Sequence, residues 1–576
     1  MLKSNTLTCC CRYTIFLLLL AFTTHATHST HTPRKRAHIN SHVGARAHTL
    51  QPGALDVMSY GAKPDNTTDN TGPFQAALDA CSAAHGGEVF IGTGMFRFKG
   101  SISIPPGCTL SGTYTVVPSH DLRNSQNPQK IQDGTVLVPL GGRNISGGCD
   151  INCTQYFINV GPNGVLRGLV IYYEEQETTE TPVPYPWSVY LGDPDQKYGT
   201  GSANNAAVTD VELLGAWNGI AAVAAHRHYI ARVQGQPLNI GVFVDETYDI
   251  GRIVSFHVEP ILQFLTPSWI TVDTVLVFMF NTRVLVCFMI LVFVSYTHLF
   301  FLLCSLSLSL SWSNTRFAFS LTLLFALSQE DVHFNPWYSD AHPFVWYQTT
   351  HGRAFVMGRS DWEYVFNTFA FGYAIGYHFI ERATGSMNGN FLGIGQDLAT
   401  NASIQVDQSQ PFGILITNGE FTAFCDKNGF SPPSCKDPSQ VVVSSQNKGA
   451  VKLVNSAFWG PSAQIAKIDG KGTVTFSQCH FDSWDNYWIN KTRRHNGTAA
   501  IQQYGGSLIV TQSEFTMDAN YDQPNNPVHF WLGPNAQKTI VSENMIKGKL
   551  SIENHGKGKT IVVNNADDSP IVPSEL

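Results

Sequence analysis

The middle of this chain contains short apolar runs, and several of them are followed by a carboxylate. Examples are "AAVTDVELLG" and "FVDETYDIGRI". The aspartates concerned are Asp210, Asp245, Asp249 and Asp331. Two carboxyl groups held close together can act as a general acid and as a general base or nucleophile, which is what hydrolysis of a glycosidic bond requires. We expect Asp210 and Asp245 to form such a pair, with Glu212 on the same face as Asp210. The alternative is that these residues only form turns at strand ends.

Histidine and arginine side chains near these carboxylates could bind an anion or transfer a proton. His333 and Arg252 become close neighbours if residues 254–329 are left out of the chain. A purely structural role for His333 is the alternative. The other arginines of the region are Arg227, Arg353 and Arg359. Recognition of an acidic polysaccharide would need several arginine or lysine side chains that point to the same place. These few arginines therefore do not establish an acidic polysaccharide as the ligand.

The segment Val332–Phe379 is unusually rich in aromatic residues. Aromatic rings stack on the C–H faces of sugars, so these side chains are candidates for substrate binding. The candidates are Trp337, Tyr338, Trp346, Tyr347 and Trp362. Filling of the interior is the alternative role for them.

The elements that must position all these side chains are short strands. Four segments, beginning at Val451, Val474, Leu508 and Thr539, share an eight-residue pattern. It has inward residues at positions one and three, a small or amide residue at six and an apolar residue at eight. Alternation is the strand period, and the polar sixth position suits a turn. Such repetition predicts a solenoid, and we infer an all-β fold, a single-stranded right-handed parallel β-helix. A β-sandwich and a propeller are the alternatives, and the irregular repeat lengths count against a propeller.

One convincing amphipathic helix is expected, over Asn70–Ala84. Phe74, Ala77, Leu78 and Cys81 form its apolar stripe. A short helix at this place would cap the open N-terminal end of the strand stack, which otherwise exposes unpaired backbone groups.

Residues 254–329 differ abruptly from the rest of the chain, because they contain neither Gly nor Lys whereas the whole chain has 49 Gly. A membrane span is one interpretation, since the run is long and apolar. It would, however, separate the two halves of one stack. Removing the run joins "YDIGRI" to "EDVHFNPWYS" and restores a strand. The run begins with Val, whose codons start with GT, and ends with Gln, which has a codon that ends in AG. Its last part requires codons that are rich in pyrimidines. These are the marks of an intron translated in frame, which is the interpretation we favour.

The N-terminus predicts export. Residues 1–26 have basic residues, an apolar core and small residues at a cleavage site, so they are expected to be a signal peptide and the protein to be extracellular. A signal anchor is the alternative. Residues 27–54 are basic and lack apolar periodicity, as in a disordered linker or pro-segment. The net charge of −7 argues against nucleic acid as a partner.

Export permits disulfides and glycans. Cys149 with Cys153, and Cys425 with Cys435, are locally spaced and are expected to close loops; zinc ligation is the alternative, but no second pair stands at ligand spacing. Outside the signal peptide and residues 254–329 the cysteine number is odd, so at least one thiol is unpaired within the chain. The possible glycosylation sites are Asn66, Asn144, Asn152, Asn401, Asn490 and Asn496.

The stretches "YGAKPDNTTDNT", "GGEVFIGTGMF" and "SISIPPGCTLSG" near the N-terminus resemble the first rung of the pectate-lyase-like superfamily, in particular its rhamnogalacturonase/epimerase-like group, relatives of polygalacturonase. The resemblance implies a right-handed β-helix, hydrolysis or β-elimination of acidic polysaccharides, and a sugar chain lying along one strand face. The catalytic motifs of the polygalacturonase type do not carry over. Its Asn-Thr-Asp, Gly-His-Gly and Arg-Ile-Lys motifs are absent, and the only Asp-Asp is Asp567–Asp568 in the C-terminal tail.

Together these observations predict one β-helix formed by residues 55–253 and 330–565, followed by a tail at 566–576. We expect a monomeric secreted protein that acts on a pectin-like polysaccharide, as a glycoside hydrolase with paired carboxylates. A polysaccharide lyase and a non-catalytic glycan-binding protein are the alternatives. No cofactor and no metal are expected, and no membrane association if residues 254–329 are an artefact.

Overall fold

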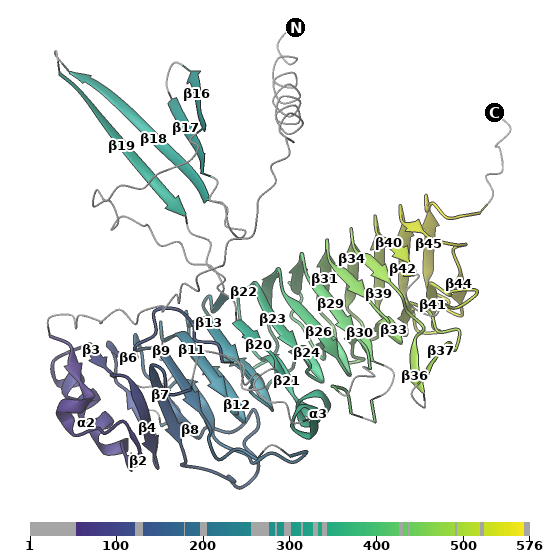
Figure 1. The fold of residues 1–576 in the computed structure, drawn as a ribbon. Helices are drawn as coiled ribbons and strands as arrows, with labels where there is room; N and C mark the ends of the chain where they lie inside the picture. The colour runs from purple at the N-terminus through teal and green to yellow at the C-terminus, as the bar shows by residue number, and fades with distance from the viewer. Residues whose placement is uncertain are drawn as a thin grey trace, which may run out of the picture. The chain divides into compact units, whose positions relative to one another are not determined.

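The computed structural model describes residues 53–120, 131–177, 179–195, 204–254, 332–336, 342–425, 430–432, 434–435, 438–489, 492–518 and 523–569, together with the backbone of four strands between residues 276 and 325. Over most of these residues the chain winds into coils of short strands, and each strand pairs in parallel with its counterparts in the coils before and after it (Figure 1). The predicted parallel β-helix is confirmed.

One parallel sheet takes a single strand from each coil, and we call it row one. Its strands are β5 (Ile102–Ile104), β8 (Tyr156–Val160), β10 (Trp187–Leu191), β12 (Asn218–Val223), β14 (Ile240–Asp245), β21 (Arg353–Met357), β24 (Ile375–Phe379), β27 (Ala402–Val406), β30 (Ser439–Val443), β33 (Gln464–Ile468), β38 (Ile501–Gln503), β41 (Phe530–Leu532) and β44 (Ile552–Asn554).

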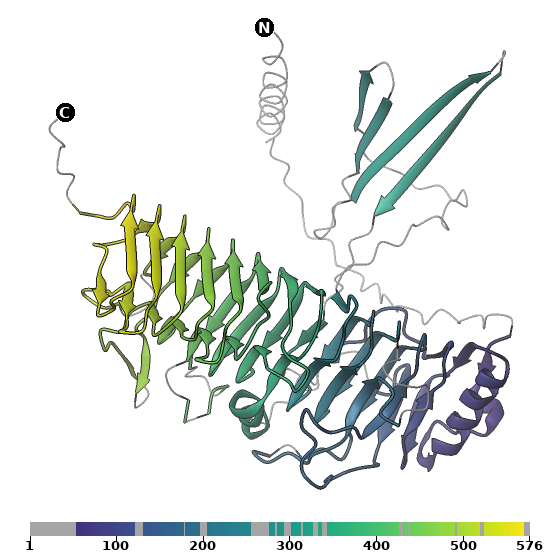
Figure 2. The same cartoon turned by 180° about the vertical axis from the view of Figure 1, so that it is seen from behind.

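The second parallel sheet takes the remaining strands of the coils (Figure 2). In its N-terminal part these are β1 (Leu55–Asp56), β2 (Asp65–Asp69), β3 (Gly87–Phe90), β4 (Gly94–Phe98), β6 (Cys108–Ser111), β7 (Thr135–Pro139), β9 (Val165–Tyr172), β11 (Ala207–Leu214) and β13 (Tyr229–Gly235). After β13 each coil contributes two strands, which form two further rows.

Row two consists of β15 (Arg252–Val254), β22 (Glu363–Phe366), β25 (Gly389–Leu392), β28 (Ile414–Thr417), β31 (Ala450–Val454), β34 (Thr473–Ser477), β39 (Ser507–Thr511), β42 (Lys538–Ser542) and β45 (Lys559–Val563). Row three consists of β20 (Val332–Phe334), β23 (Thr368–Phe371), β26 (Gly395–Ala399), β29 (Glu420–Ala423), β32 (Ala457–Trp459), β35 (His480–Asp482), β40 (Glu514–Thr516) and β43 (Met545–Ile546). A separate antiparallel pair is formed by β36 (Tyr487–Ile489) and β37 (Thr492–Arg494).

The helix predicted at the N-terminal end is α2 (Thr71–Ala83), which follows the short 3-10 helix η1 (Val57–Tyr60). Its buried residues are the predicted Phe74, Ala77, Leu78 and Cys81. Phe74 meets Phe96 and Phe98 of β4 edge to face, at 5.3 and 4.9 Å between ring centres. The apolar stripe therefore fastens the helix to the first coils.

A second helix, α3 (His342–His351), is not anticipated by the sequence pattern. The expectation of one amphipathic helix is not contradicted, because α3 has no apolar face of its own. Residues 342–351, "HPFVWYQTTH", are crowded with aromatic and β-branched residues, which favour strands, and show no helical stripe. The helix is instead stabilised by tertiary contacts, such as that of Tyr347 with Trp217 at 5.2 Å between ring centres.

The eight-residue pattern is confirmed by burial. Val451, Leu453, Ser456 and Phe458 of its first copy are all buried, as are their counterparts in the other three copies. The residue at position five adopts a left-handed backbone conformation in each copy, at Asn455, Gln478, Gln512 and Glu543. This one residue turns the chain from row two into row three, and Asn adopts that conformation more readily than most residues.

The buried sixth positions form a hydrogen-bonded ladder along the stack. The Cys479 backbone N–H donates to Ser513 Oγ (3.1 Å), and the Ser513 backbone N–H donates to Asn544 Oδ1 (2.9 Å). Asn544 also donates from Nδ2 to the Val510 carbonyl (3.1 Å). The polar side chains thereby satisfy backbone groups that the turn leaves without a strand partner.

The interior between the rows is apolar and contains columns of stacked aromatic rings among its aliphatic side chains. Phe458 stacks on Phe421 and on Phe481, at 5.3 and 5.7 Å between ring centres, and each of the three comes from a successive strand of row three. Because parallel strands place equivalent side chains directly above one another, identical residues pack into continuous columns.

Residues 254–329 interrupt the stack between β15 and β20. The described strands within them, β16 (Leu276–Thr282), β17 (Leu285–Val292), β18 (Phe301–Trp312) and β19 (Thr315–Phe325), pair only with one another, as an antiparallel sheet. Among the described residues no helix is both long and apolar enough to span a bilayer.

Candidate functional site

The predicted catalytic pair is not brought together. Asp210 lies in β11 of the second sheet, and Asp245 ends β14 of row one. Asp210 accepts two hydrogen bonds from the Arg232 guanidinium, at 2.6 and 2.8 Å. Asp245 accepts from Arg382 Nε at 2.6 Å and from the Arg359 backbone N–H at 2.8 Å. Each carboxylate is thus largely buried and neutralised by its own arginine, which is the arrangement of a structural ion pair.

The remaining candidates from the same region are scattered. Glu212 does not share an exposed face with Asp210, because it is fully buried and bonds to the His120 ring at 2.5 Å. Asp249 pairs with Arg227 at the surface. His333 is half-buried and packs edge-on against Phe369, Arg252 is exposed, and Asp331 lies outside the described residues.

The aromatic candidates do not form one platform. Trp337 and Tyr338 lie outside the described residues. Trp346 is half-buried in α3, whereas Trp362 is exposed in the turn before β22.

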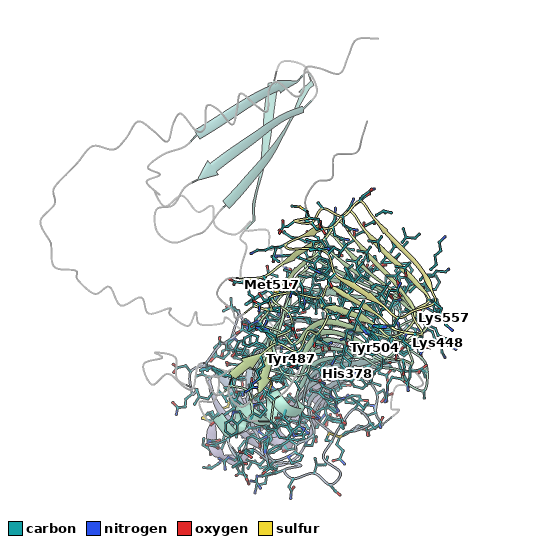
Figure 3. The ribbon with its side chains drawn as sticks, turned by 90° about the vertical axis from the view of Figure 1, so that its right-hand side faces the viewer. His378, Lys448, Tyr487, Tyr504, Met517 and Lys557 are labelled. Atoms are coloured by element: carbon teal, nitrogen blue, oxygen red, sulfur yellow. A yellow bond between two sulfur atoms is a disulfide. The ribbon has the colours of Figure 1, made fainter. Side chains whose placement is uncertain are left out.

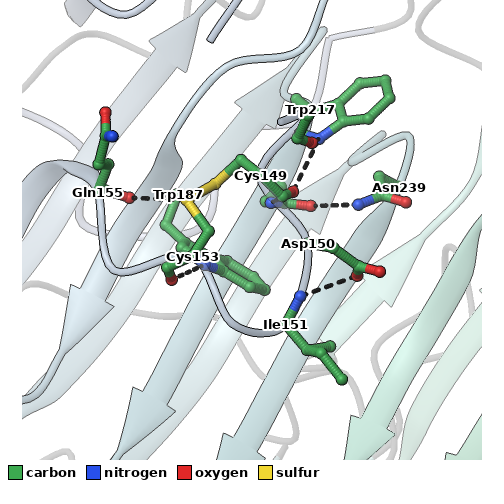
Figure 4. Close-up of a disulfide and its surroundings, with 10 residues drawn as sticks. Cys149, Asp150, Ile151, Cys153, Gln155, Trp187, Trp217 and Asn239 are labelled. Atoms are coloured by element: carbon green, nitrogen blue, oxygen red, sulfur yellow. Dashed lines mark hydrogen bonds between the residues drawn. A yellow bond between two sulfur atoms is a disulfide. The ribbon is translucent and has the colours of Figure 1, made fainter. Parts of the chain in front are cut away.

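Both predicted disulfides are confirmed, at Cys149–Cys153 and Cys425–Cys435. The Cys149–Cys153 loop is fastened over row one, because the indole N–H groups of Trp187 and Trp217 donate to the Cys153 and Cys149 carbonyls at 3.0 and 3.1 Å (Figure 4). A third bridge, Cys81–Cys108, ties α2 to β6 and was missed because its partners are far apart in sequence. Cys479 is a free, buried thiol. Such bridges are typical of an oxidising, extracellular-type environment.

The possible glycosylation sites differ in accessibility. Asn144, Asn152, Asn401 and Asn496 are exposed. Asn66 is partly buried and donates from Nδ2 to Glu174 at 3.3 Å, and Asn490 lies outside the described residues.

The outer face of row one carries an aligned strip of side chains that the sequence pattern did not single out. His378, Gln405, Val442, Lys467, Gln502 and Trp531 are register partners on six successive strands. Their neighbours along each strand, such as Tyr377, Ile404 and Val441, are buried. Side chains alternate across a strand, so the six share the outward face. We call these residues, with the second column described next, the row-one strip.

A second column runs beside the first, two residues further along each strand. It contains Asp407, Ser444, Asp469, Tyr504 and His555. Backbone hydrogen bonds continue the ladder here, from Asp407 to the Phe379 carbonyl at 2.8 Å, from Ser444 to Val406 at 2.9 Å and from Asp469 to Val443 at 3.0 Å. His378 and Tyr504 are seen on the same side of the molecule in Figure 3.

His378 and Asp407 form a hydrogen-bonded pair on this strip. His378 Nε2 lies 2.8 Å from Asp407 Oδ2, and Gln405 donates to Asp407 Oδ1 at 3.1 Å. Burial alone would raise the pKa of Asp407, but the hydrogen bond and charge of His378 and the Gln405 amide offset it, so that the pKa is lowered. Asp407 is therefore ionised near neutral pH.

A second carboxylate stands nearby on the same column. Ser444 separates Asp407 from Asp469, so the two aspartates are two strands apart. At about 4.8 Å a strand, their backbones are roughly 10 Å from each other. This is close to the carboxyl separation of about 6.5 to 9.5 Å that inverting glycosidases use.

Aromatic rings continue the strip beyond Asp469. Tyr504 and Trp531 are 5.0 Å apart between ring centres, and Trp531 and His555 are 5.9 Å apart. Tyr504 is 40% exposed, so a ring face is accessible to solvent. Exposed rings in line with polar side chains suit the stacking of sugar units. Among the described side chains there is no cluster of three or more His, Cys, Asp or Glu suited to a metal ion.

Comparison with known proteins confirms the resemblance in the N-terminal part. Residues 54–148 match the model of the family described as rhamnogalacturonase A/epimerase, pectate lyase-like. No curated protein matches the chain. The motifs that identify the family lie in the first coils, away from the row-one strip.

Solved structures share the β-helix. The A-module of a mannuronan C-5 epimerase from Azotobacter vinelandii is 11% identical, with 90% of this chain and 100% of the module covered and a TM-score of 0.32. PfbA, a surface adhesin of Streptococcus pneumoniae, is 11% identical, with 89% and 91% covered and a TM-score of 0.40. The catalytic unit of a GH87 α-1,3-glucanase from Streptomyces thermodiastaticus is 9% identical, with 90% and 69% covered and a TM-score of 0.36. Likeness at this level carries no information about activity.

Proposed function

We propose that the protein is a secreted glycoside hydrolase that binds a polysaccharide along the row-one strip and cleaves it between Asp407 and Asp469. The observation that carries this proposal is the alignment of these two carboxylates, two strands apart on one exposed face, in line with the rings of Tyr504 and Trp531.

The two aspartates would divide the work of an inverting hydrolysis. Asp407, whose pKa His378 and Gln405 hold low despite its partial burial, is ionised and activates a water molecule. Asp469 protonates the oxygen of the leaving sugar. Ser444, which lies between the two aspartates, has a small side chain, and a water molecule between the carboxylate and the sugar ring is what this separation requires. His378 is a positioning residue in this scheme, because it acts on Asp407 rather than on the substrate.

The strip also fits a linear ligand. Successive strands repeat at about 4.8 Å, close to the length of a sugar unit, so a chain lying along the stack meets equivalent positions in turn. Rings stack on the sugar faces, while Gln405, Lys467 and Gln502 supply hydrogen bonds from the other column.

The test is release of reducing ends from a panel of neutral and acidic polysaccharides. Asp407→Asn and Asp469→Asn should each lower kcat by about a hundredfold or more, as is usual when a catalytic acid or base is removed. Asp79→Asn, on the exposed face of α2, is the matched control and should leave the rate unchanged. Full activity in both strip variants would refute the assignment. Products that absorb ultraviolet light because they are unsaturated would favour a lyase, and binding without any product would favour a glycan-binding protein.

A further inference from the structure

The outer face of row three carries a second aligned strip, on a different side of the coil from row one. Thr422, Trp459, Asp482 and Thr516 are register partners on four successive strands. Glu420, Ala457, His480 and Glu514 form the column beside them. The residue between the two columns is a buried phenylalanine in each strand, at Phe421, Phe458, Phe481 and Phe515. Because side chains alternate, both columns face outward. We call these residues the row-three strip.

Trp459 stands at the centre of this strip with its side chain 40% exposed. Its neighbour in the second column of the same strand, Ala457, has a small side chain. A tryptophan that is held by a rigid sheet and open to solvent is a platform for a sugar ring.

Hydrogen-bonding groups lie on both sides of the indole. On one side Thr422 Oγ1 donates to Asp397 at 2.7 Å. On the other side Thr516 Oγ1 donates to Asp482 at 2.9 Å and lies 2.8 Å from His480 Nε2. Thr422 and Asp482 are themselves buried, at 2% and 9% exposed, so these bonds hold the strand face rigid around the indole. The acceptors open to sugar hydroxyl groups are the exposed carboxylates of the neighbouring column, Glu420 and Glu514.

The strip leads into a hollow of about 310 Å³ near the C-terminal end. Its lining includes Glu514, Thr516, Met545, Lys547, Asp567 and Asp568. The volume is at the lower end of the range for small-ligand sites, so it would take about one or two sugar units.

The charge of the strip selects the kind of sugar. Asp397, Glu420, Asp482 and Glu514 are carboxylates, and Lys547 is the cation that lines the hollow. An acidic polysaccharide would meet like charges here, which disfavours binding. We propose that the row-three strip is a second glycan-binding site, specific for a neutral polysaccharide, with Trp459 as its stacking platform. It stands independently of the hydrolase proposed at row one.

The test is affinity electrophoresis of the full chain in gels that contain galactomannan, mixed-linkage β-glucan or polygalacturonate. We expect retardation by at least one of the neutral polymers, and we expect Trp459→Ala to weaken it at least fivefold. Trp459→Phe keeps a ring and should retain most of the binding, which separates loss of stacking from loss of folding. Phe412→Ala, which removes an 85% exposed ring outside both strips, is the matched control and should bind as the unaltered protein does.

Three results would overturn the site: no retardation by either neutral polymer, neutral retardation that survives Trp459→Ala when Trp531→Ala is present as well, or a loss of retardation on Trp459→Ala in the polygalacturonate gel alone. The row-one variant Trp531→Ala separates the two proposals. It should weaken cleavage while leaving the Trp459-dependent retardation intact.

Discussion

Ile253 and Val332 both pair with the same neighbouring strand, β13, although residues 254–331 lie between them in sequence. On β13, Ile230 pairs with Ile253 and Val233 pairs with Val332. On the other side, Val365 pairs with Ile253 and Thr368 pairs with Val332. In each neighbouring coil, therefore, two residues lie between the partner of Ile253 and the partner of Val332. They are Ala231 and Arg232 in the coil before, and Phe366 and Asn367 in the coil after.

Removal of residues 254–329 leaves two residues, Glu330 and Asp331, between Ile253 and Val332. Asp331 would then be in register with Arg232 and Asn367 of the neighbouring coils. Both of these residues have a left-handed backbone conformation, which aspartate tolerates. We expect the deleted protein to fold and to be more stable, by on the order of 3 kcal/mol, because a long loop no longer has to be closed. Urea denaturation of both forms measures this. A deleted protein that is less stable or does not fold would contradict this expectation, and a mature transcript that encodes residues 254–329 would contradict the intron interpretation.

Replacement of His378 should change the pH dependence of catalysis. The hydrogen bond and charge of His378 lower the pKa of Asp407, so His378→Ala should raise that pKa. Asp407 must be ionised to activate water, so the acid limb of the kcat/KM profile should move to higher pH. A profile that keeps its shape while the rate falls would mean that His378 has only a structural role.

His529 should make the protein sensitive to acid. It is fully buried against Trp484 and Phe515, and burial lowers its pKa to about 4. The unfolded chain, with a histidine pKa near 6.5, therefore binds a proton more readily, and stability falls as the pH drops from about 6.5 towards 4. The loss at pH 5 should be about 2 kcal/mol. Denaturation at pH 7 and pH 5 measures it, and His529→Gln should show a smaller difference. An equal difference in the variant would contradict this role.

Cys479 should be unreactive in the folded protein. It is buried within the ladder of sixth positions, and burial raises the pKa of its thiol to about 11. Little thiolate exists at neutral pH, and access is blocked as well. Alkylation followed by mass spectrometry should label Cys479 in denaturant and leave it unlabelled in buffer. Rapid labelling of Cys479 in buffer would show that this part of the stack opens readily.

The turn between rows two and three offers a matched pair of substitutions. Asn544→Ala should lower the free energy of unfolding by about 2 kcal/mol, because it leaves the buried Ser513 N–H and Val510 carbonyl without partners. Asn455→Gly should cost less than about 0.5 kcal/mol, since Asn455 is exposed and glycine adopts its left-handed conformation easily. Similar costs at the two positions would show that the ladder contributes nothing beyond backbone conformation.

The features that the sequence determined by itself are local. Alternation with a polar sixth position predicted the coils, the stripe from Phe74 to Cys81 predicted α2, and two short spacings predicted Cys149–Cys153 and Cys425–Cys435. Each depends on contacts within a few residues or on a repeat that every coil must obey, because the same column of interior side chains continues through the stack.

Which outward residues share a face was decided only by the tertiary structure. Loops of unequal length separate the strands, so distance along the chain does not reveal that Asp407, Ser444 and Asp469 are level with one another, or that Asp210 and Asp245 lie in different sheets. Nor does it reveal that Arg232 and Arg382 neutralise those two aspartates. Register and ion pairing are properties of the assembled stack. They arise because hydrogen bonds between coils, rather than the order of residues, set which side chains become neighbours.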